Sequence, residues 1–313
     1  MHTYCSRRHF LLGTAALALR AQDTEPTFSS NVKVVNTLAT VQNRSGELIH
    51  DLKKEDFTVL EDRRPQVIRY FSQQSDLPLT LGLMVDTSMS QEKVMDAERG
   101  ASMQFLDQLF RENKDHVFLM QFDMTIQLRQ PLTSSLKPLY SVLPYVDTPT
   151  RRELMSGGSA GTLLFDAIIK ASKDVMKPLQ GRKALIVLSD GVDVGSEANV
   201  SDAVEAAQKA DTLIYSIEFS DASFYGGHVF GGNEGRNALM KLASETGGGF
   251  FSVSKKLSIE QIFSMIDAEL RNQYSIGYVS DKPCTISEFR KIQLTLKQKG
   301  LIVQARTRYW AQP

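Results

Sequence analysis

The sequence predicts an α/β fold: a doubly wound, mostly parallel sheet flanked by N- and C-terminal β segments that form a small β-sandwich. Three observations lead to this prediction. Short apolar runs alternate with segments of helical periodicity over residues 77–273, which is the pattern of a parallel sheet with helices on both faces. Residues 22–76 and residues 274–313 carry the period-two alternation of β-strands instead.

The N-terminal β segment begins with alternating apolar and polar residues over 32–41. This alternation stops at the turn signal Asn43-Arg44-Ser45-Gly46, and the combination predicts a hairpin. Residues 52–62 and 66–71 predict two further strands.

The central region begins with a strand and a helix. Residues 79–85 are almost continuously apolar, which is typical of a strand buried on both faces. Apolar residues then recur at helical spacing from residue 94 to residue 110. The alternation continues with strands expected at residues 117–122, 184–188, 213–217 and 250–253, and helices at 163–175, 200–210, 237–246 and 259–271.

The C-terminal β segment contains three expected strands, at residues 274–278, 290–296 and 301–306, with a turn at Gly300. A β segment at each end of the chain would leave an apolar face uncovered. We therefore expect the two segments to pair. The predicted division is a signal peptide at 1–21, an N-terminal β segment at 22–76, the α/β domain at 77–273 and a C-terminal β segment at 274–313.

The first residues resemble an export signal. Arg7 and Arg8 stand directly before the short apolar run of residues 10–19, which ends in small residues. The paired arginines favour a twin-arginine (Tat) signal, and an ordinary secretory (Sec) signal stays as the alternative. Either predicts a protein exported to the periplasm, the cell surface or the medium. No apolar stretch of the chain, this run included, is long enough for a spanning helix, so no membrane span is expected after signal removal.

Composition and charge exclude several classes of protein. Of the 313 residues, 42% are hydrophobic and 23% charged, which is typical of soluble globular proteins. Removing residues 1–21 takes away three arginines and no acidic residue, so the formal charge falls from zero to −3. Nucleic-acid binding needs a basic patch, and we expect no nucleic-acid partner. Cys5 leaves with the signal and Cys284 is then alone, which excludes a disulfide within the mature chain.

The most specific motif is Asp86-Thr87-Ser88-Met89-Ser90, which lies between the first buried strand and the first helix. Ligands of open α/β sheets bind beyond the carboxyl ends of the strands. One carboxylate and two hydroxyls at alternate positions present hard oxygens, which suit magnesium, manganese or calcium. Taken alone, the same residues also fit a helix N-cap.

The motif resembles the Asp-x-Ser-x-Ser of the metal-ion-dependent adhesion site in von Willebrand factor type A (VWA) domains, which have a Rossmann-like fold. Thr162, in Gly161-Thr162, matches the threonine loop of that family, and Asp190, in Ser189-Asp190-Gly191, matches its second aspartate. The resemblance implies that Ser88, Ser90 and Thr162 contact the metal. It implies that Asp86 and Asp190 hold the ion largely through water.

Other stretches resemble a bacterial exported family termed VWA related. These are residues 52–71, 242–248 and 306–310, together with Gln273-Tyr274 and Gly277-Tyr278. The family does not indicate what its members bind. Three neutral hydroxyls and two carboxylates would leave the ion electrophilic with an exchangeable position, so we expect a non-enzymatic module that engages an Asp or Glu of a protein partner. The alternative is a metal-dependent accessory component of a larger envelope or chelatase-like assembly.

Other residues near these motifs are weaker candidates for a functional role. Asp166 is interpreted as a structural residue near a helix start, Asp193 as a loop residue at the rim, and Asp123 as a candidate for the outer shell of the metal. Residues 157–162 lack the lysine of a phosphate-binding loop. The histidines are too scattered along the sequence to form a catalytic zinc site. The sequence also offers no candidate general base for a hydrolase. The glycine-rich residues 226–232 are interpreted as a connector or as a partner-contacting loop.

Overall fold

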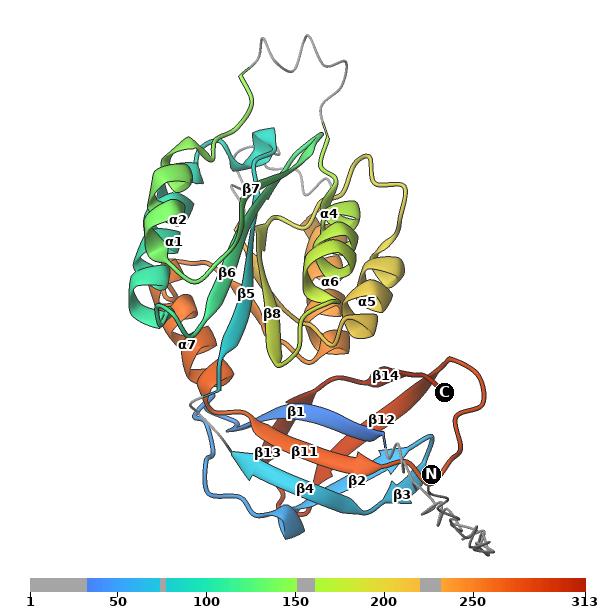
Figure 1. Cartoon of the computed structure of the whole chain (residues 1–313). Coiled ribbons are helices and arrows are strands. Elements are labelled where there is room, and N and C mark those ends of the chain that lie inside the picture. The colour runs from blue at the N-terminus through green and yellow to red at the C-terminus, as the bar shows by residue number, and fades with distance from the viewer. Residues whose placement is uncertain (1–32, 74–76, 151–160, 220–231) are drawn as a thin grey trace, which may run out of the picture. The chain divides into compact units, whose positions relative to one another are not determined.

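The central sheet has six strands in the order β10-β9-β8-β5-β6-β7 (Figure 1). Five of them are parallel, and β7 pairs antiparallel with β6 at one edge. β5 and β8 lie in the middle, and every residue of both strands is buried. The strands are β5 (Leu79–Asp86), β6 (His116–Phe122), β7 (Ile126–Thr133), β8 (Arg182–Ser189), β9 (Leu213–Glu218) and β10 (Phe250–Ser252).

This computed structural model describes residues 33–73, 77–150, 161–219 and 232–313, all within one compact unit of the chain. The expected signal peptide at 1–21 lies outside the described residues. So do residues 22–32 of the N-terminal β segment, and the glycine-rich stretch as far as residue 231.

Helices cover both faces of the central sheet (Figure 1). On one face lie α1 (Met95–Leu109), α2 (Leu136–Val142) and α7 (Ile259–Arg271). On the other face lie α4 (Leu164–Lys170), α5 (Val200–Lys209) and α6 (Gly232–Thr246). Short helical turns occur at η1 (Lys54–Asp56), η2 (Met89–Gln91), η3 (Leu143–Tyr145) and η4 (Ala171–Met176).

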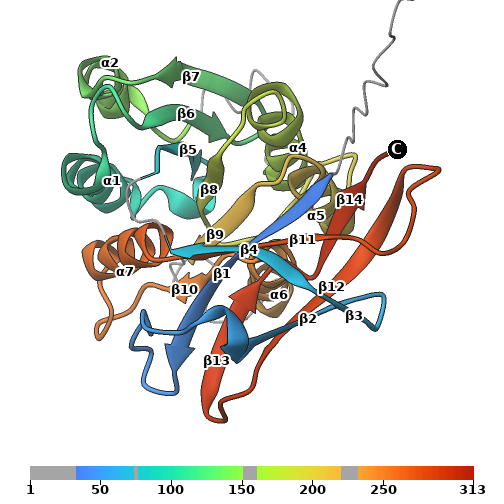
Figure 2. The same ribbon diagram turned by 60° about the horizontal axis from the view of Figure 1, so that its bottom comes forward.

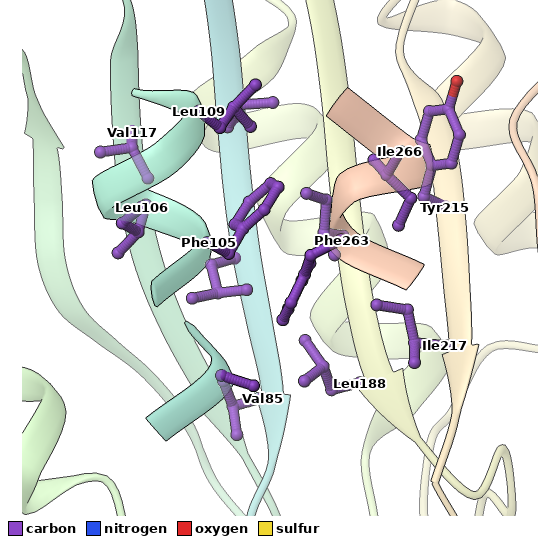
Figure 3. Close-up of a cluster of buried hydrophobic side chains, with 14 of the residues drawn as sticks. Val85, Phe105, Leu106, Leu109, Val117, Leu188, Tyr215, Ile217, Phe263 and Ile266 are labelled. Atoms are coloured by element: carbon purple, nitrogen blue, oxygen red, sulfur yellow. The ribbon is translucent and has the colours of Figure 1, made fainter. Parts of the chain in front are cut away.

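The face under α1 and α7 is a dense apolar layer. Phe105 of α1 and Phe263 of α7 stack with their ring centroids 4.2 Å apart (Figure 3). Both rings are almost fully buried and belong to the cluster that includes Val85 and Leu188 of the central strands. Burial of this kind contributes about 25 cal/mol per Å² of apolar surface and fixes both helices on the sheet.

The remaining strands form two four-stranded antiparallel sheets (Figure 2). One has the order β13-β1-β11-β4 and the other β14-β12-β2-β3. Their inward side chains share a single apolar cluster, which makes them a small β-sandwich. The first sheet contains β1 (Val34–Asn43), β4 (Ile68–Gln73), β11 (Tyr274–Val279) and β13 (Leu301–Ala305), and the second β2 (Phe57–Glu61), β3 (Arg64–Gln66), β12 (Glu288–Leu296) and β14 (Arg308–Ala311).

The fold class predicted from the sequence is confirmed, including the β segments that flank the α/β domain. Strands β1 and β2 from the N-terminal side pair with β11, β13 and β12 from the C-terminal side. The boundaries assigned to the separate domains stay predictions. Of the described helices, none has the length and apolar composition needed to cross a bilayer.

Several elements differ from the prediction. Residues 34–43 form one continuous strand, followed by a turn at Asn43–Glu47 and a bridge between Gln42 and Leu48 rather than a two-stranded hairpin. The helix expected at 163–175 is α-helical only to Lys170 and continues as a π-helix. Strands β7 and β14, the short strand β3 and helix α2 were not predicted as separate elements.

Candidate metal centre

The two aspartates of the predicted site follow neighbouring parallel strands. β5 ends at Asp86, and Asp190 comes directly after β8. The two strands pair in parallel, with Val85 opposite Leu188. Since parallel strands end at the same edge of a sheet, both aspartates lie at the carboxyl edge, where ligands of this fold class bind.

Asp86 is hydrogen-bonded to both loops. Its Oδ1 accepts a hydrogen bond of 2.9 Å from the backbone N–H of Ser88, and its Oδ2 accepts one of 2.5 Å from the hydroxyl of Ser189. The Oγ atoms of Ser88 and Ser90 are 3.1 Å apart. The loop thus gathers one carboxylate and two hydroxyls, and Ser189 holds it against the start of the second loop.

Thr162 lies on the third loop, which Asp123 connects to the first. The backbone N–H of Leu163 donates to the carbonyl oxygen of Asp123 over 2.8 Å. The carboxylate of Asp123 accepts a 2.8 Å hydrogen bond from the hydroxyl of Thr87. Thr162 itself pairs with Val194, through backbone hydrogen bonds of 3.0 and 3.1 Å. Asp123 therefore ties the Thr162 loop to the loop of Asp86, and the hydrogen bonds do not run directly from Thr162 to the serines.

The electrostatics of the site favour a bound cation. Asp86 is fully buried, and this burial together with the nearby charge of Asp190 raises the pKa of Asp86 to about 7. The hydrogen bonds from Ser189 and Ser88 oppose that shift. Two neighbouring buried carboxylates repel each other unless a positive charge lies between them. The donor set of carboxylate and hydroxyl oxygens fits a hard divalent cation such as magnesium.

The weaker candidates have identifiable roles at the same edge. Asp193 accepts hydrogen bonds from the backbone N–H of Phe165 and the hydroxyl of Ser196, at 3.0 and 2.6 Å. Asp166 accepts from the backbone N–H groups of Glu197 and Ala198. Both aspartates connect the start of α4 to the loop after β8, and this agrees with a structural interpretation.

Sequence reasoning missed three participants in this region, namely Thr87, Ser189 and Glu98. Thr87 and Ser189 are fully buried and donate hydrogen bonds to Asp123 and Asp86. Glu98 lies on α1 with no exposed surface. A signal for Glu98 existed, since it stands four residues after Val94 and three before Ala101, on the apolar face of the helix.

Comparison with known proteins identifies structural neighbours. No protein-family model and no curated protein matches the sequence. A von Willebrand factor type A protein from Catenulispora acidiphila has 12% identity and a TM-score of 0.48, covering 90% of this chain and 75% of that one. BatB from Bacteroides thetaiotaomicron, described as a conserved hypothetical protein, has 18% identity and a TM-score of 0.44, covering 61% and 97%.

Proximal thread matrix protein 1 from the mussel byssus, solved with zinc in its metal-ion-dependent adhesion site, is a third neighbour. It has 12% identity and a TM-score of 0.48, and the match covers 68% of this chain and 50% of that one. At these identities and TM-scores, the neighbours do not indicate which ligand or partner this chain binds. Any inference about them depends on the residues of this chain.

Proposed function

We propose that this chain is an exported VWA-type binding protein that holds a divalent cation through Asp86, Ser88, Ser90, Thr162 and Asp190. The observation that carries the proposal is the buried carboxylate of Asp86. It lies close enough to Asp190 for that charge to raise its pKa, and it is fixed by Ser88 and Ser189 at the carboxyl edge of the sheet. The resemblance to the adhesion-site motif supports the same five residues.

The chemistry of this donor set favours recognition of an acidic group. Magnesium prefers six oxygen ligands and keeps several waters when the protein supplies few charges. Three neutral hydroxyls and two carboxylates would leave the ion electrophilic, with an exchangeable position. An Asp or Glu side chain of a protein partner is the proposed occupant of that position. Manganese and calcium are accommodated by the same type of ligand.

Export is part of the proposal. The paired arginines Arg7 and Arg8 before a short apolar run support a Tat signal, with Sec as the alternative. We propose cleavage near residue 21 and residence in the periplasm or at the cell surface. The division into residues 22–76, 77–273 and 274–313 belongs to the same proposal.

The test is Asp86→Asn in the mature chain. We expect Mg²⁺ to raise the Tm of the wild type, because a ligand that binds only the folded state stabilises it by RT ln(1 + [L]/Kd). The variant is expected to lose this rise, with Kd weakened roughly 10- to 100-fold or more. Asp174→Asn is the matched control, since Asp174 is an exposed carboxylate paired with Lys170 away from the loops.

Partner binding is tested by affinity capture from the envelope fraction of the source cells. A protein retained in Mg²⁺ and released by a chelator is the expected result, and Asp86→Asn should retain none. Equal capture by the wild type and by this variant would refute the ion-mediated contact. Capture of a nucleotide-dependent enzyme would instead favour the accessory-component alternative.

A further inference from the structure

Glu98 is a buried carboxylate for which the fold provides no partner. It lies on α1 with no exposed surface. Within the part of the chain that the structure describes, neither Oε1 nor Oε2 has a hydrogen-bond partner. Burying a carboxylate in this way is costly, and such groups normally pair with a cation, a donor or ordered water.

Electrostatic interactions connect Glu98 with the candidate metal centre. Its pKa is raised well above the usual value, first by burial and then by the charges of Asp86 and Asp190. All three causes act in the same direction. Glu98 lies in the first turn of α1, the helix that follows the loop of Asp86 along the chain, so its charge acts on both aspartates from the helix and not from the loops at the sheet edge.

Gln91 provides a second, independent observation of an unpartnered buried polar atom beside the metal loop. It is fully buried, and its Nε2 lies 3.4 Å from the hydroxyl of Ser90. Its Oε1 has no partner among the described residues. Gln91 ends the short turn η2 of the metal loop, and Glu98 lies in the first turn of α1, the helix that follows that loop along the chain. An amide oxygen and two carboxylate oxygens thus lack donors behind the metal loop.

Glu98 is not placed as a direct ligand. No group of three or more acidic, His or Cys side chains within the described ranges is arranged to hold an ion directly. Water molecules on the inner side of a bound ion would supply the donors that Glu98 and Gln91 lack. Groups that orient bound water in this way tune the affinity of metal sites.

We propose that Glu98 accepts hydrogen bonds from water molecules bound to the cation and supplies the third negative charge of the metal centre. This inference rests on the proposed function, since it requires an ion at Asp86 and Asp190. It makes Glu98 a positioning residue that binds the ion through water and raises the selectivity of the site for highly charged cations. The five residues of the motif alone supply two charges, and Glu98 makes the count three.

The experiment compares Glu98→Gln with the wild type in the mature chain by titration with Mg²⁺, Mn²⁺ and Tb³⁺. We expect a loss of divalent-cation affinity of roughly 10- to 100-fold. The loss of affinity should be larger for Tb³⁺, because removing one negative charge from the site weakens the binding of a trivalent ion more than that of a divalent ion. A purely structural role would leave the ratio of the Tb³⁺ and Mg²⁺ affinities unchanged.

The stability of the metal-free protein provides a second readout, which should change in the opposite direction to the metal affinity. Glu98→Gln removes the cost of burying an unpartnered carboxyl group, so it is expected to raise the Tm of the metal-free protein, while the rise produced by added Mn²⁺ becomes smaller. The matched control is Glu269→Gln, which makes the same change at a buried carboxylate on α7. It should leave metal affinity unchanged. Glu98→Met, of similar volume and without charge, replaces Glu98→Gln should that variant fail to fold.

The outcomes separate this inference from the proposed function. A wild type that binds none of the three ions overturns both. Binding that is lost in Asp86→Asn but unchanged in Glu98→Gln and Glu98→Met overturns the inference alone. Weakened binding in the Glu98 variants, with the Tb³⁺ affinity reduced most and the Glu269→Gln control unaffected, supports it.

Discussion

At the scale of single residues, Gly191 is packed too closely for any side chain. It follows Asp190 and has a φ of +81°, in the left-handed region that L residues other than glycine avoid. A Cβ atom at this position would lie 2.3 Å from the carbonyl oxygen of Gly235 in α6. The loop after β8 is therefore pressed against the first turn of α6, and this contact fixes the backbone that carries Asp190.

We predict that Gly191→Ala lowers both stability and metal affinity. Gly300 is a matched control, since it has a φ of +88° and open space around a Cβ. Gly300→Ala should cost only the conformational strain, about 1 kcal/mol. Gly191→Ala adds a backbone clash, so its cost should exceed the control by about 2 kcal/mol. Chemical denaturation and Mn²⁺ titration measure the two effects, and equal losses in both variants would contradict the packing argument.

The sequence predicted the local part of the candidate site and missed the part that depends on tertiary structure. Asp86, Ser88 and Ser90 lie within one loop, and their spacing is visible in the sequence. Glu98 is twelve residues further along the chain, and its place in the acidic group depends on how α1 packs on the sheet. A single glutamate on the apolar face of a helix indicates a buried carboxylate, but its spacing in the sequence does not predict which loop lies next to it.

At the scale of elements, Asp115 joins the start of β5 to the ends of two helices. Its carboxylate accepts hydrogen bonds from the backbone N–H of Leu79, the guanidinium of Arg111 after α1, and the guanidinium of Arg271 at the end of α7, at 2.8 to 3.1 Å. Burial alone would raise the pKa of Asp115, but these hydrogen bonds hold it well below its usual range. The ionised form is therefore the one that the fold requires.

The hydrogen bonds of Asp115 predict that the protein loses stability in acid. The folded-state pKa lies below the unfolded value of about 3.9, so ionised Asp115 stabilises the fold above that pH and the contribution is lost as the pH falls further. Asp115→Asn should lower stability by about 3 to 5 kcal/mol at pH 7, because Arg271 and Arg111 lose a buried partner. The difference from the wild type should shrink below pH 4. Urea unfolding at several pH values tests this, and a difference independent of pH would be inconsistent with it.

The elements that were missed have weak apolar patterns. β7 contains Pro131 and has no buried residue, which an edge strand permits because proline cannot donate to a neighbouring strand. β14 has four residues, too few for an alternation to stand out. By contrast, the fully buried runs of β5 and β8 were visible at once. Sequence patterns therefore predicted the elements that carry the core and missed those at its margins.

At the scale of the whole described chain, polar contacts connect α7 and α5 to the β-sandwich. The Nε2 of Gln304 in β13 donates to Oε2 of Glu269 over 3.2 Å, and Arg308 in β14 donates to Gln208 in α5 over 2.6 Å. Burial raises the pKa of Glu269 to about 7, against the hydrogen bond from Gln304. The α/β domain and the sandwich therefore meet at a carboxyl group that titrates near neutral pH.

We predict that this carboxyl group makes stability fall as the pH rises. Its folded-state pKa is above the unfolded value of about 4.3, so its favourable contribution is complete below pH 4 and is lost as the pH passes through about 7. Glu269→Gln should be close to the wild type at pH 4 and more stable by roughly 3 kcal/mol at pH 9. Thermal unfolding of both proteins between pH 4 and pH 9 tests this prediction. Parallel pH profiles for the two proteins would exclude the assignment.

The pairing of β1 with β11 and β13 sets an order for folding on the ribosome. β1 lies between β11 and β13, which are both synthesised after the six-stranded sheet, and β2 pairs with β12, which is synthesised between them. The strands of the six-stranded sheet are all translated before β11, so the nascent α/β domain can close while β1 has no partner and β2 is paired only with β3. Their open edges are prone to aggregation during that interval. A nascent chain stalled before residue 274 would therefore be a better chaperone substrate than the released chain, in which β11 and β13 can pair with β1.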